Sequence, residues 1–246
     1  MANKMANKMP SKSNNPIFCA IDTRDTARAC VLAESLSGAV GGLKIGLEYF
    51  NAHGTQGYQK LAAFEQPIFL DLKLHDIPNT VASAVRALAP LQPALLNVHA
   101  GGGAAMMQAA ADAAHEAHDK GLHVPEMLGV TIMTSLADAD LHQMGIAGTA
   151  QDQVLRLANL AQKNGMDGVV CSAHEIEVLR AELGPDFKLI VPGIRPQGSA
   201  TQDQKRVMTP EDAQKAGADI LVIGRPITGA EAPRQAALDI AAQLNA

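Results

Sequence analysis

Eight short apolar runs recur along this chain of 246 residues and limit the folds that it can adopt. Each run is four to six residues long and lacks strict alternation of apolar and polar side chains. Strands of this kind are buried on both faces, as in a parallel sheet covered by helices. The runs are Ile17–Ile21, Val40–Ile45, Ile68–Leu72, Leu95–His99, Met127–Thr131, Gly168–Cys171, Leu189–Pro192 and Ile220–Gly224.

Segments rich in alanine and leucine, with helical periodicity, separate the runs, and several of them end at glycine. They include Thr26–Ser37, Val81–Leu88, Ala104–Lys120, Asp152–Asn164, Ala173–Leu183, Pro210–Ala216 and Pro233–Leu244. This alternation matches a (β/α)₈ TIM barrel in size and count. A doubly wound sheet is the alternative, but no GxGxxG motif follows the first run. We predict one α/β barrel domain over residues 16–246, preceded by a disordered tail over residues 1–15.

Composition narrows the classes of function. The net charge of −5 does not favour a polyanionic partner, and two Tyr, five Phe and no Trp leave little to stack on bases. We therefore expect no nucleic-acid partner. No apolar stretch approaches the roughly 20 residues of a membrane span, and the lysine-rich start lacks the apolar core of a signal peptide. Three widely spaced cysteines without a CxxC motif fit reduced thiols in a cytoplasmic protein.

Ionisable residues gather where the first three runs end. The stretch FLDLKLHDIPNTV places Asp71, Lys73 and Asp76 at the end of the third run, Asp22 follows the first run, and Lys44 lies near the end of the second. Burying a charge costs several kcal/mol unless it is paired. Because barrel active sites lie at the carboxyl ends of the strands, we predict a catalytic site there. We expect no comparable set of charges at the opposite end.

Each of these residues also has a structural interpretation. Asp71 and Lys73 are two apart on a strand, so their side chains share a face and could form an ion pair without function. Lys44 could extend out of a strand end. Asp22 and Asp76 could each cap the helix that follows, although other capping residues stand nearby.

Three weaker patterns involve histidine and glycine. His99 ends the fourth run and could be a hydrogen-bonded strand-end residue or a catalyst. His115 and His118 are three apart on a predicted helix, but no carboxylate completes a metal-binding pattern, so we expect a solvated face and no metal site. The glycines of Gly101–Gly103 lack the spacing and the lysine of a P-loop.

The last two runs each lead into a glycine beside an arginine, in Gly193–Arg195 and in Gly224 with Arg225. These loops form the usual phosphate site of the barrel. Glycine lets backbone N–H groups approach the anion, and arginine adds a charged fork. The long polar segment Pro196–Arg206 is predicted to be a lid, with Gln204 as an amide donor to the phosphate. The sequence therefore predicts a phosphate monoester as substrate.

The segment Asp71–Thr80, DLKLHDIPNT, resembles the signature of the orotidine 5′-monophosphate decarboxylase family, in its bacterial branch. Shorter segments resemble the family in the same order. They are Ala20–Asp22, Lys44–Gly46, Asn97–Ala100, Gly129–Thr131, Pro192–Pro196 and Val222–Pro226.

The resemblance implies an enzyme that converts orotidine 5′-monophosphate to UMP and CO₂, the last step of de novo pyrimidine synthesis, without metal or cofactor. It implies Lys73 as the proton donor, with Asp71 beside the substrate carboxylate. Asp71 and Asp76 on either side would keep Lys73 charged, and Lys44 would make the array Lys44-Asp71-Lys73-Asp76 neutral.

The resemblance also implies the remaining contacts. Asp22 and Lys44 reach ribose hydroxyls, and Asp76 and Thr80 reach the partner's site in a homodimer. The residues that touch the pyrimidine or the phosphate are Thr131, Arg195, Gln204, Gly224 and Arg225.

Two other functions stay open. A sugar-phosphate decarboxylase or hexulose-phosphate synthase of the same superfamily would bind Mg²⁺ through carboxylates on neighbouring strands, where Lys44 would repel the ion. A non-catalytic nucleotide-binding barrel would tolerate the loss of Lys73 or Asp71.

Overall fold

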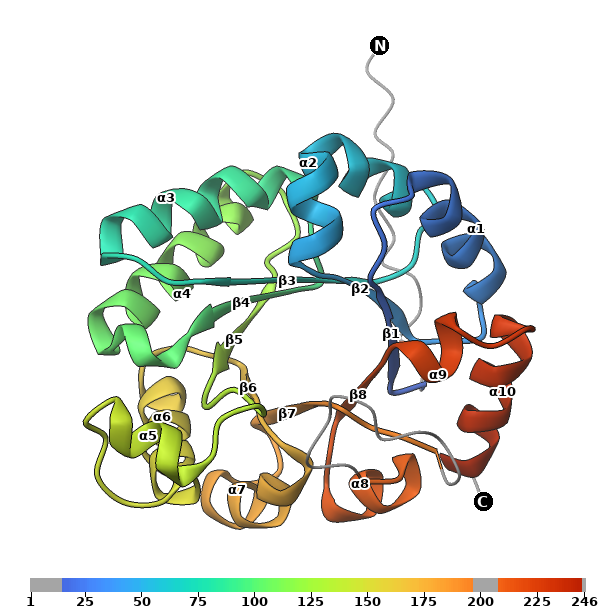
Figure 1. Ribbon diagram of the computed structural model, residues 1–246. Helices are drawn as coiled ribbons and strands as arrows, with labels where there is room; N and C mark the ends of the chain where they lie inside the picture. Colours follow the sequence, from blue (N-terminus) through green and yellow to red (C-terminus); the bar gives the residue numbers. More distant parts are fainter. Residues whose placement is uncertain (1–14, 197–207, 245–246) are drawn as a thin grey trace.

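The computed structural model describes residues 15–196 and 208–244, and eight parallel strands close there into a barrel (Figure 1). The strands follow one another around the barrel in chain order, and β8 pairs with β1 to close it. The helices form a layer outside this ring (Figure 1). The predicted (β/α)₈ barrel is confirmed. The predicted tail lies outside the described residues, apart from Asn15.

Each predicted apolar run corresponds to one strand, and the ends differ by at most two residues. The strands are β1 (Ile17–Ile21), β2 (Gly42–Ile45), β3 (Ile68–Leu74), β4 (Leu95–His99), β5 (Glu126–Val130), β6 (Gly168–Val170), β7 (Lys188–Pro192) and β8 (Ile220–Ile223). β3 continues two residues beyond its apolar run, and this extension includes Lys73.

The helices are α1 (Thr26–Leu36), α2 (Leu47–Ala62), α3 (Pro78–Leu88), α4 (Ala104–Asp119), α5 (Asp138–Gln143), α6 (Ala150–Lys163), α7 (Ile176–Leu183), α8 (Pro210–Ala216), α9 (Arg225–Thr228) and α10 (Pro233–Leu244). The sequence pattern does not indicate α2, because Gly54 and Gly57 interrupt it. Gly54 has φ 59° and kinks the helix. α5 and α9 are too short to show a periodicity.

Neither Asp22 nor Asp76 occupies the N-cap position of the helix that follows it. Asp25 caps α1, because its carboxylate accepts the N–H groups of Ala27 and Arg28 at 2.9 and 3.1 Å. Ile77 precedes α3 at the N-cap position. Asp22 is therefore available for other contacts. Among the described residues, no helix is both long and apolar enough to span a membrane.

Two apolar clusters hold the barrel together. The larger one lies between the strands and the surrounding helices. The smaller one consists of Phe18, Ala20, Phe69, Leu95, Leu128, Ile190 and Val222 from the barrel strands. Asp71 and Asn97 lie two residues beyond Phe69 and Leu95 on neighbouring strands. The face of the strands that carries this cluster thus changes from apolar to polar toward their carboxyl ends.

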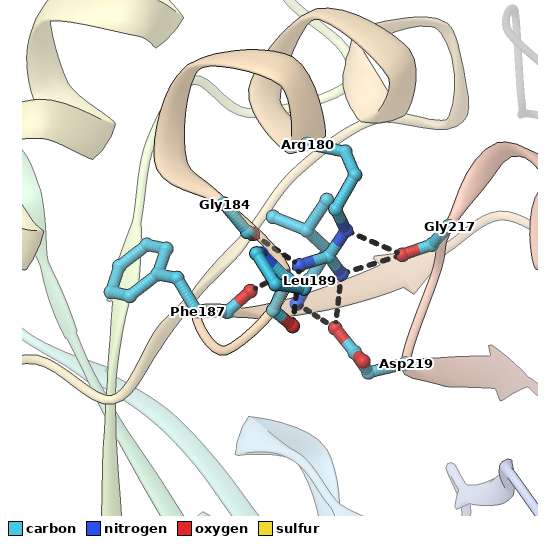
Figure 2. A network of polar contacts seen from close by, with 7 residues as sticks. Arg180, Gly184, Phe187, Leu189, Gly217 and Asp219 are labelled. Atoms are coloured by element: carbon cyan, nitrogen blue, oxygen red, sulfur yellow. Dashed lines mark hydrogen bonds and ion pairs between the residues drawn. The ribbon is translucent and has the colours of Figure 1, made fainter.

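The amino-terminal ends of β7 and β8 carry a polar network around Arg180 of α7 (Figure 2). Its guanidinium donates to the carbonyl oxygens of Gly184, Phe187 and Gly217 at 2.6–3.3 Å. It also pairs with Asp219 at 2.6 Å, whose carboxylate accepts the N–H of Leu189 at 2.7 Å. The network joins α7 to the starts of both strands.

A related arrangement lies at the starts of β5 to β7. Asp167 accepts the N–H of Met127 at 2.7 Å, and Glu126 pairs with Lys188. The expectation that this end lacks a comparable set of charges is therefore wrong. These residues stand far apart in the sequence, and only the register of the closed barrel brings them together.

Candidate active site

Four ionisable side chains meet at the carboxyl ends of β1, β2 and β3. Lys44 Nζ lies 3.5 Å from Asp22 Oδ1 and 3.3 Å from Asp71 Oδ2. Lys73 Nζ lies 2.6 Å from Asp71 Oδ1. The two side chains in the middle of the array, Lys44 and Asp71, are each only 12% exposed. The structure thus brings these predicted residues together in a row of alternating charges, in the order Asp22, Lys44, Asp71 and Lys73.

The charge of Asp71 is maintained by its neighbours. Burial raises the pKa of this carboxyl group, but the Lys44 and Lys73 ammonium groups and hydrogen bonds from Lys73 and Asn97 outweigh that effect and hold the pKa below its usual value of 3.8. Asp71 is therefore a carboxylate at neutral pH.

The backbone of Lys73 adopts a left-handed conformation with φ 52°. For a residue with a Cβ, this conformation is less stable than the right-handed one by roughly 1–2 kcal/mol. The register also shifts at this point, because Leu70 pairs with Leu96 and Leu74 pairs with Val98. Four steps along β3 thus match two along β4, which is a bulge. Asp71 and Lys73 were predicted to share a face because they are two residues apart on a regular strand. Their side chains do meet, but the strand between them is bulged and not regular.

Asn97 is a residue of the site to which the sequence pattern assigned no role. It is fully buried on β4, opposite the bulge. Its Nδ2 donates to Asp71 Oδ1 at 2.7 Å, and its Oδ1 accepts the backbone N–H of Lys73 at 2.7 Å. The signal in the sequence is an amide inside the apolar run LLNVH, since a buried amide requires partners.

A pocket of about 180 Å³ opens beside the charged array. Lys44, Asp71 and Lys73 form its charged wall. The remaining lining is mostly apolar and consists of Phe69, Val130, Ile132, Met133, Thr134, Val170, Cys171, Pro192 and Val222. A flat organic ring with a charged substituent fits such a lining, because its apolar face and its charged edge both find matching surroundings.

Asp76 and Thr80 lie apart from this pocket. All six residues of the segment His75–Thr80 are exposed, and Ile77 exposes 66% of its surface. The Asp76 carboxylate accepts the N–H of Ile77 at 2.7 Å. Among the described ion pairs of this chain, none joins Asp76 to Lys73, so the predicted array with Asp76 does not form within one subunit of the described structure.

Thr131 follows β5 and is buried, and its hydroxyl donates to the carbonyl oxygen of Val170 at 3.1 Å. Two neighbours of Thr131 in the chain, Val130 and Ile132, line the pocket. This places Thr131 beside the apolar wall.

The two Gly-Arg loops leave the barrel side by side, because the register pairs Pro192 of β7 with Val222 of β8. Gly193 has φ 81°, a conformation that favours glycine. Arg195 is buried, and its Nη1 donates to the carbonyl oxygen of Ile194 at 2.9 Å. Gly224 precedes α9, which begins at Arg225. Gln204 and nearly all of the predicted lid lie outside the described residues.

The histidines contribute little to this site. The rings of His99 and His75 lie 5.3 Å apart, and burial, His75 and Lys73 lower the pKa of His99. This histidine is therefore neutral near pH 7, and it is absent from the described pocket lining. His118 is exposed beside Asp119. Within the described parts of the chain, no three His, Cys, Asp or Glu side chains are placed to hold a metal ion.

Comparison with known proteins assigns the chain to a family. The model of the orotidine 5′-phosphate decarboxylase / HUMPS family matches residues 15–240. This chain belongs to that family. The matched region contains all eight strands and the four ionisable residues at the ends of β1 to β3, Asp22, Lys44, Asp71 and Lys73.

Individual relatives agree with this assignment. A protein from Rhodospirillum rubrum named orotidine 5′-phosphate decarboxylase is 56% identical over 238 residues, which cover 96% of each chain. One of the same name from Paramagnetospirillum magneticum is 53% identical and covers 94% of this chain and 98% of its own. The crystal structure of orotidine 5′-phosphate decarboxylase from Lactobacillus acidophilus superposes with a TM-score of 0.83 at 36% identity and covers 94% of this chain and 100% of its own.

The donor set at the strand ends does not fit a magnesium ion. The two carboxylates that could bind one, those of Asp22 and Asp71, are separated by Lys44, whose Nζ lies within 3.5 Å of both. An ammonium group at this position repels a divalent cation and takes up the oxygen atoms that the ion would need.

Proposed function

We propose that this protein decarboxylates orotidine 5′-monophosphate to UMP and CO₂, in the last step of de novo pyrimidine synthesis. The observation that carries the proposal is the Lys73 ammonium group held 2.6 Å from Asp71 in the wall of a mostly apolar pocket. Loss of CO₂ from C6 leaves a carbanion in the plane of the ring, which the π system cannot delocalise. A fixed positive charge at C6 supplies the missing stabilisation.

In this proposal Lys73 has two roles. Its charge stabilises the developing carbanion, and its Nζ then transfers a proton to C6. Asp71 pairs with Lys73 and lies beside the substrate carboxylate, where repulsion between the two carboxylates favours the loss of CO₂. Lys44 offsets the charge of Asp71, so the array can be buried. The reaction proposed for these residues uses no metal and no cofactor.

The other candidate residues bind the rest of the substrate. Asp22 and Lys44 bind ribose hydroxyls, and Thr131 contacts the pyrimidine. The phosphate is bound by the two Gly-Arg loops and the segment between β7 and α8, through Arg195, Gln204, Gly224 and Arg225. Because phosphate binding is remote from C6, its binding energy supports the chemical step, and a substrate without phosphate should lose kcat as well as affinity.

The active unit in this proposal is a cytoplasmic homodimer in which Asp76 and Thr80 reach the partner's site. Supporting it, six consecutive residues from His75 to Thr80 are exposed directly after the catalytic strand, including the apolar Ile77. These residues are therefore accessible to a second subunit beside the catalytic strand. Asp76 of the partner subunit would then complete the array around Lys73.

The dimer can be tested by mixing two inactive variants, Lys73→Ala and Asp76→Ala. If Asp76 acts in the partner's site, a mixed dimer has one intact site, and random mixing should restore about a quarter of the wild-type activity. If Asp76 acts within its own subunit, every site keeps a defect and no activity returns. The separate variants, each remixed with itself, serve as controls.

The activity itself is tested by following the ultraviolet absorbance as orotidine 5′-monophosphate becomes UMP, with EDTA present and Lys73→Ala as the control. Turnover that resists EDTA and disappears in the variant supports the proposal. Activity only on a sugar phosphate with Mg²⁺ restored would favour the metal-dependent relatives. Binding of UMP without any turnover by the intact protein would indicate a non-catalytic nucleotide-binding barrel.

A further inference from the structure

The bulge in β3 leaves the backbone N–H of Lys73 without a place in the regular hydrogen bonding of the sheet. In a regular parallel ladder, the N–H of each residue meets a carbonyl oxygen on the neighbouring strand. A bulge removes residues from this ladder. Lys73 is such a residue, with φ 52° and a register shift around it. Its N–H is instead bound by a side chain, the amide oxygen of Asn97, at 2.7 Å.

The same amide also orients the carboxylate of the site. Asn97 Nδ2 donates to Asp71 Oδ1, the same oxygen atom that receives Lys73 Nζ. The orientation of the amide is fixed, because a flipped group would present NH₂ to the Lys73 N–H and an oxygen atom to the carboxylate. Asn97 is fully buried, so water does not compete for these bonds.

We propose that Asn97 is a positioning residue, which holds both the left-handed backbone of Lys73 and the carboxylate of Asp71 so that Lys73 Nζ is directed at the reacting carbon. This inference rests on the proposed decarboxylation. Asn97 itself touches neither the substrate nor the transferred proton. It acts by binding two groups at once, the main-chain N–H of Lys73 and the carboxylate of Asp71, which pairs with the Lys73 side chain.

The first test removes both hydrogen bonds at nearly constant volume. In Asn97→Leu, kcat should fall about 100-fold, because an error of about 1 Å in the position of a catalytic group has an effect of this size. Affinity for UMP, measured by calorimetry, should stay within about threefold, because phosphate and ribose bind elsewhere. The matched control is Asn159→Leu, which removes an amide that joins a carbonyl oxygen to Glu182 outside the barrel.

The second test uses pH. In Asn97→Asp, the introduced carboxyl group still accepts the Lys73 N–H but donates to Asp71 only when it is protonated. Two carboxyl groups at this distance share a proton and release it at raised pH. The kcat of this variant, divided by that of the wild type, should therefore rise as pH falls from 8 to 5.5. A constant ratio over this range would show that the hydrogen bond from position 97 to Asp71 does not affect the reaction.

Each outcome decides for or against the proposal. A folded Asn97→Leu protein with kcat within about threefold of the wild type would overturn it, since misplacement should cost far more. If that variant does not fold, a constant ratio for Asn97→Asp overturns it instead. If the wild type shows no turnover, the proposed function fails, and amide hydrogen exchange at Lys73 decides. Faster exchange in Asn97→Leu, which has no acceptor for this N–H, supports positioning, and unchanged exchange refutes it.

Discussion

The two ends of the barrel both carry charged side chains, but they use them differently. At the amino-terminal end, Arg180 and Asp219 bind backbone groups, four carbonyl oxygens and one N–H, as well as each other. At the carboxyl-terminal end, Asp71 is bound by the side chains of Lys44, Lys73 and Asn97. The first set of charges completes the hydrogen bonding of the chain, whereas the second is held by side chains beside a pocket.

This difference indicates that the charges at the amino-terminal end contribute to the stability of the fold, whereas those at the carboxyl-terminal end contribute to binding and catalysis. Charges that bind backbone atoms stabilise the fold, because removing them leaves buried polar groups without partners. Charges that bind one another around a pocket can be preorganised toward a ligand. Substitutions at the two ends should therefore separate activity from stability.

Lys73→Ala should have the largest effect on activity. We expect kcat to fall by at least about 10³-fold, because the variant loses its charge at C6. The free energy of unfolding should change by only about 1 kcal/mol, because Asp71 keeps Lys44 and Asn97 as partners. Turnover assays and urea unfolding of the same preparation measure both. A large loss of stability would show that this end also holds the fold.

Arg180→Ala should show the reverse. We expect the free energy of unfolding to fall by roughly 2–4 kcal/mol, because the carbonyl oxygens of Gly184, Phe187 and Gly217 lose a charged donor. The kcat at 25 °C should stay within about twofold. Arg156→Ala, on the exposed face of α6, is the matched control and should change stability by about 0.5 kcal/mol or less. Equal destabilisation by both variants would contradict this assignment.

Gly46→Ala should have a smaller and more local effect at the carboxyl-terminal end. A Cβ at this position would lie 2.9 Å from Lys44 Nζ and 3.3 Å from Asp22 Oδ1, so the lysine must move. The backbone, with φ −97°, accepts alanine. We expect kcat/KM to fall about tenfold, or about 1.4 kcal/mol. Gly101→Ala is the control, because its Cβ would meet no atom within 4 Å. Unchanged kinetics in Gly46→Ala would mean that the position of Lys44 is not critical.

The sequence predicts the carboxyl-terminal end better than the amino-terminal end. Asp71 and Lys73 stand together in the chain and interrupt an apolar run, so the sequence alone indicates that burying them has a cost. Asp167 and Asp219 instead stand singly before their strands and resemble ordinary loop residues. Their partners are backbone groups on the neighbouring strand, which become known only with the register.

Local departures from regular geometry could not be predicted either. The barrel follows from apolar runs whose length and spacing suit buried parallel strands. The bulge at Lys73 does not, because lysine rarely adopts positive φ and no glycine marks the position. Tertiary contacts with Asn97 stabilise that conformation, and a single residue in an apolar run does not show which atoms it will bind.

The smallest expected effect concerns pH and tests whether the lysines at the carboxyl-terminal end stabilise the carboxylate of Asp71. In the folded protein the pKa of Asp71 lies below 3.8, its usual value. Between these two values the unfolded chain binds a proton that the folded protein does not, so stability rises with pH. This contribution is complete above pH 3.8 and is lost as pH falls through the folded pKa.

In Asp71→Asn this dependence should disappear. The wild type minus variant difference in the free energy of unfolding should be constant above pH 3.8 and should shrink below it, as measured by urea unfolding from about pH 2.5 to 6. The sign follows from the ammonium groups of Lys44 and Lys73, which stabilise the carboxylate and not the acid. If the free energy of unfolding of the two proteins depended on pH in the same way, these ion pairs would not stabilise the Asp71 carboxylate in solution. The contrast between the two ends would then lose its electrostatic basis.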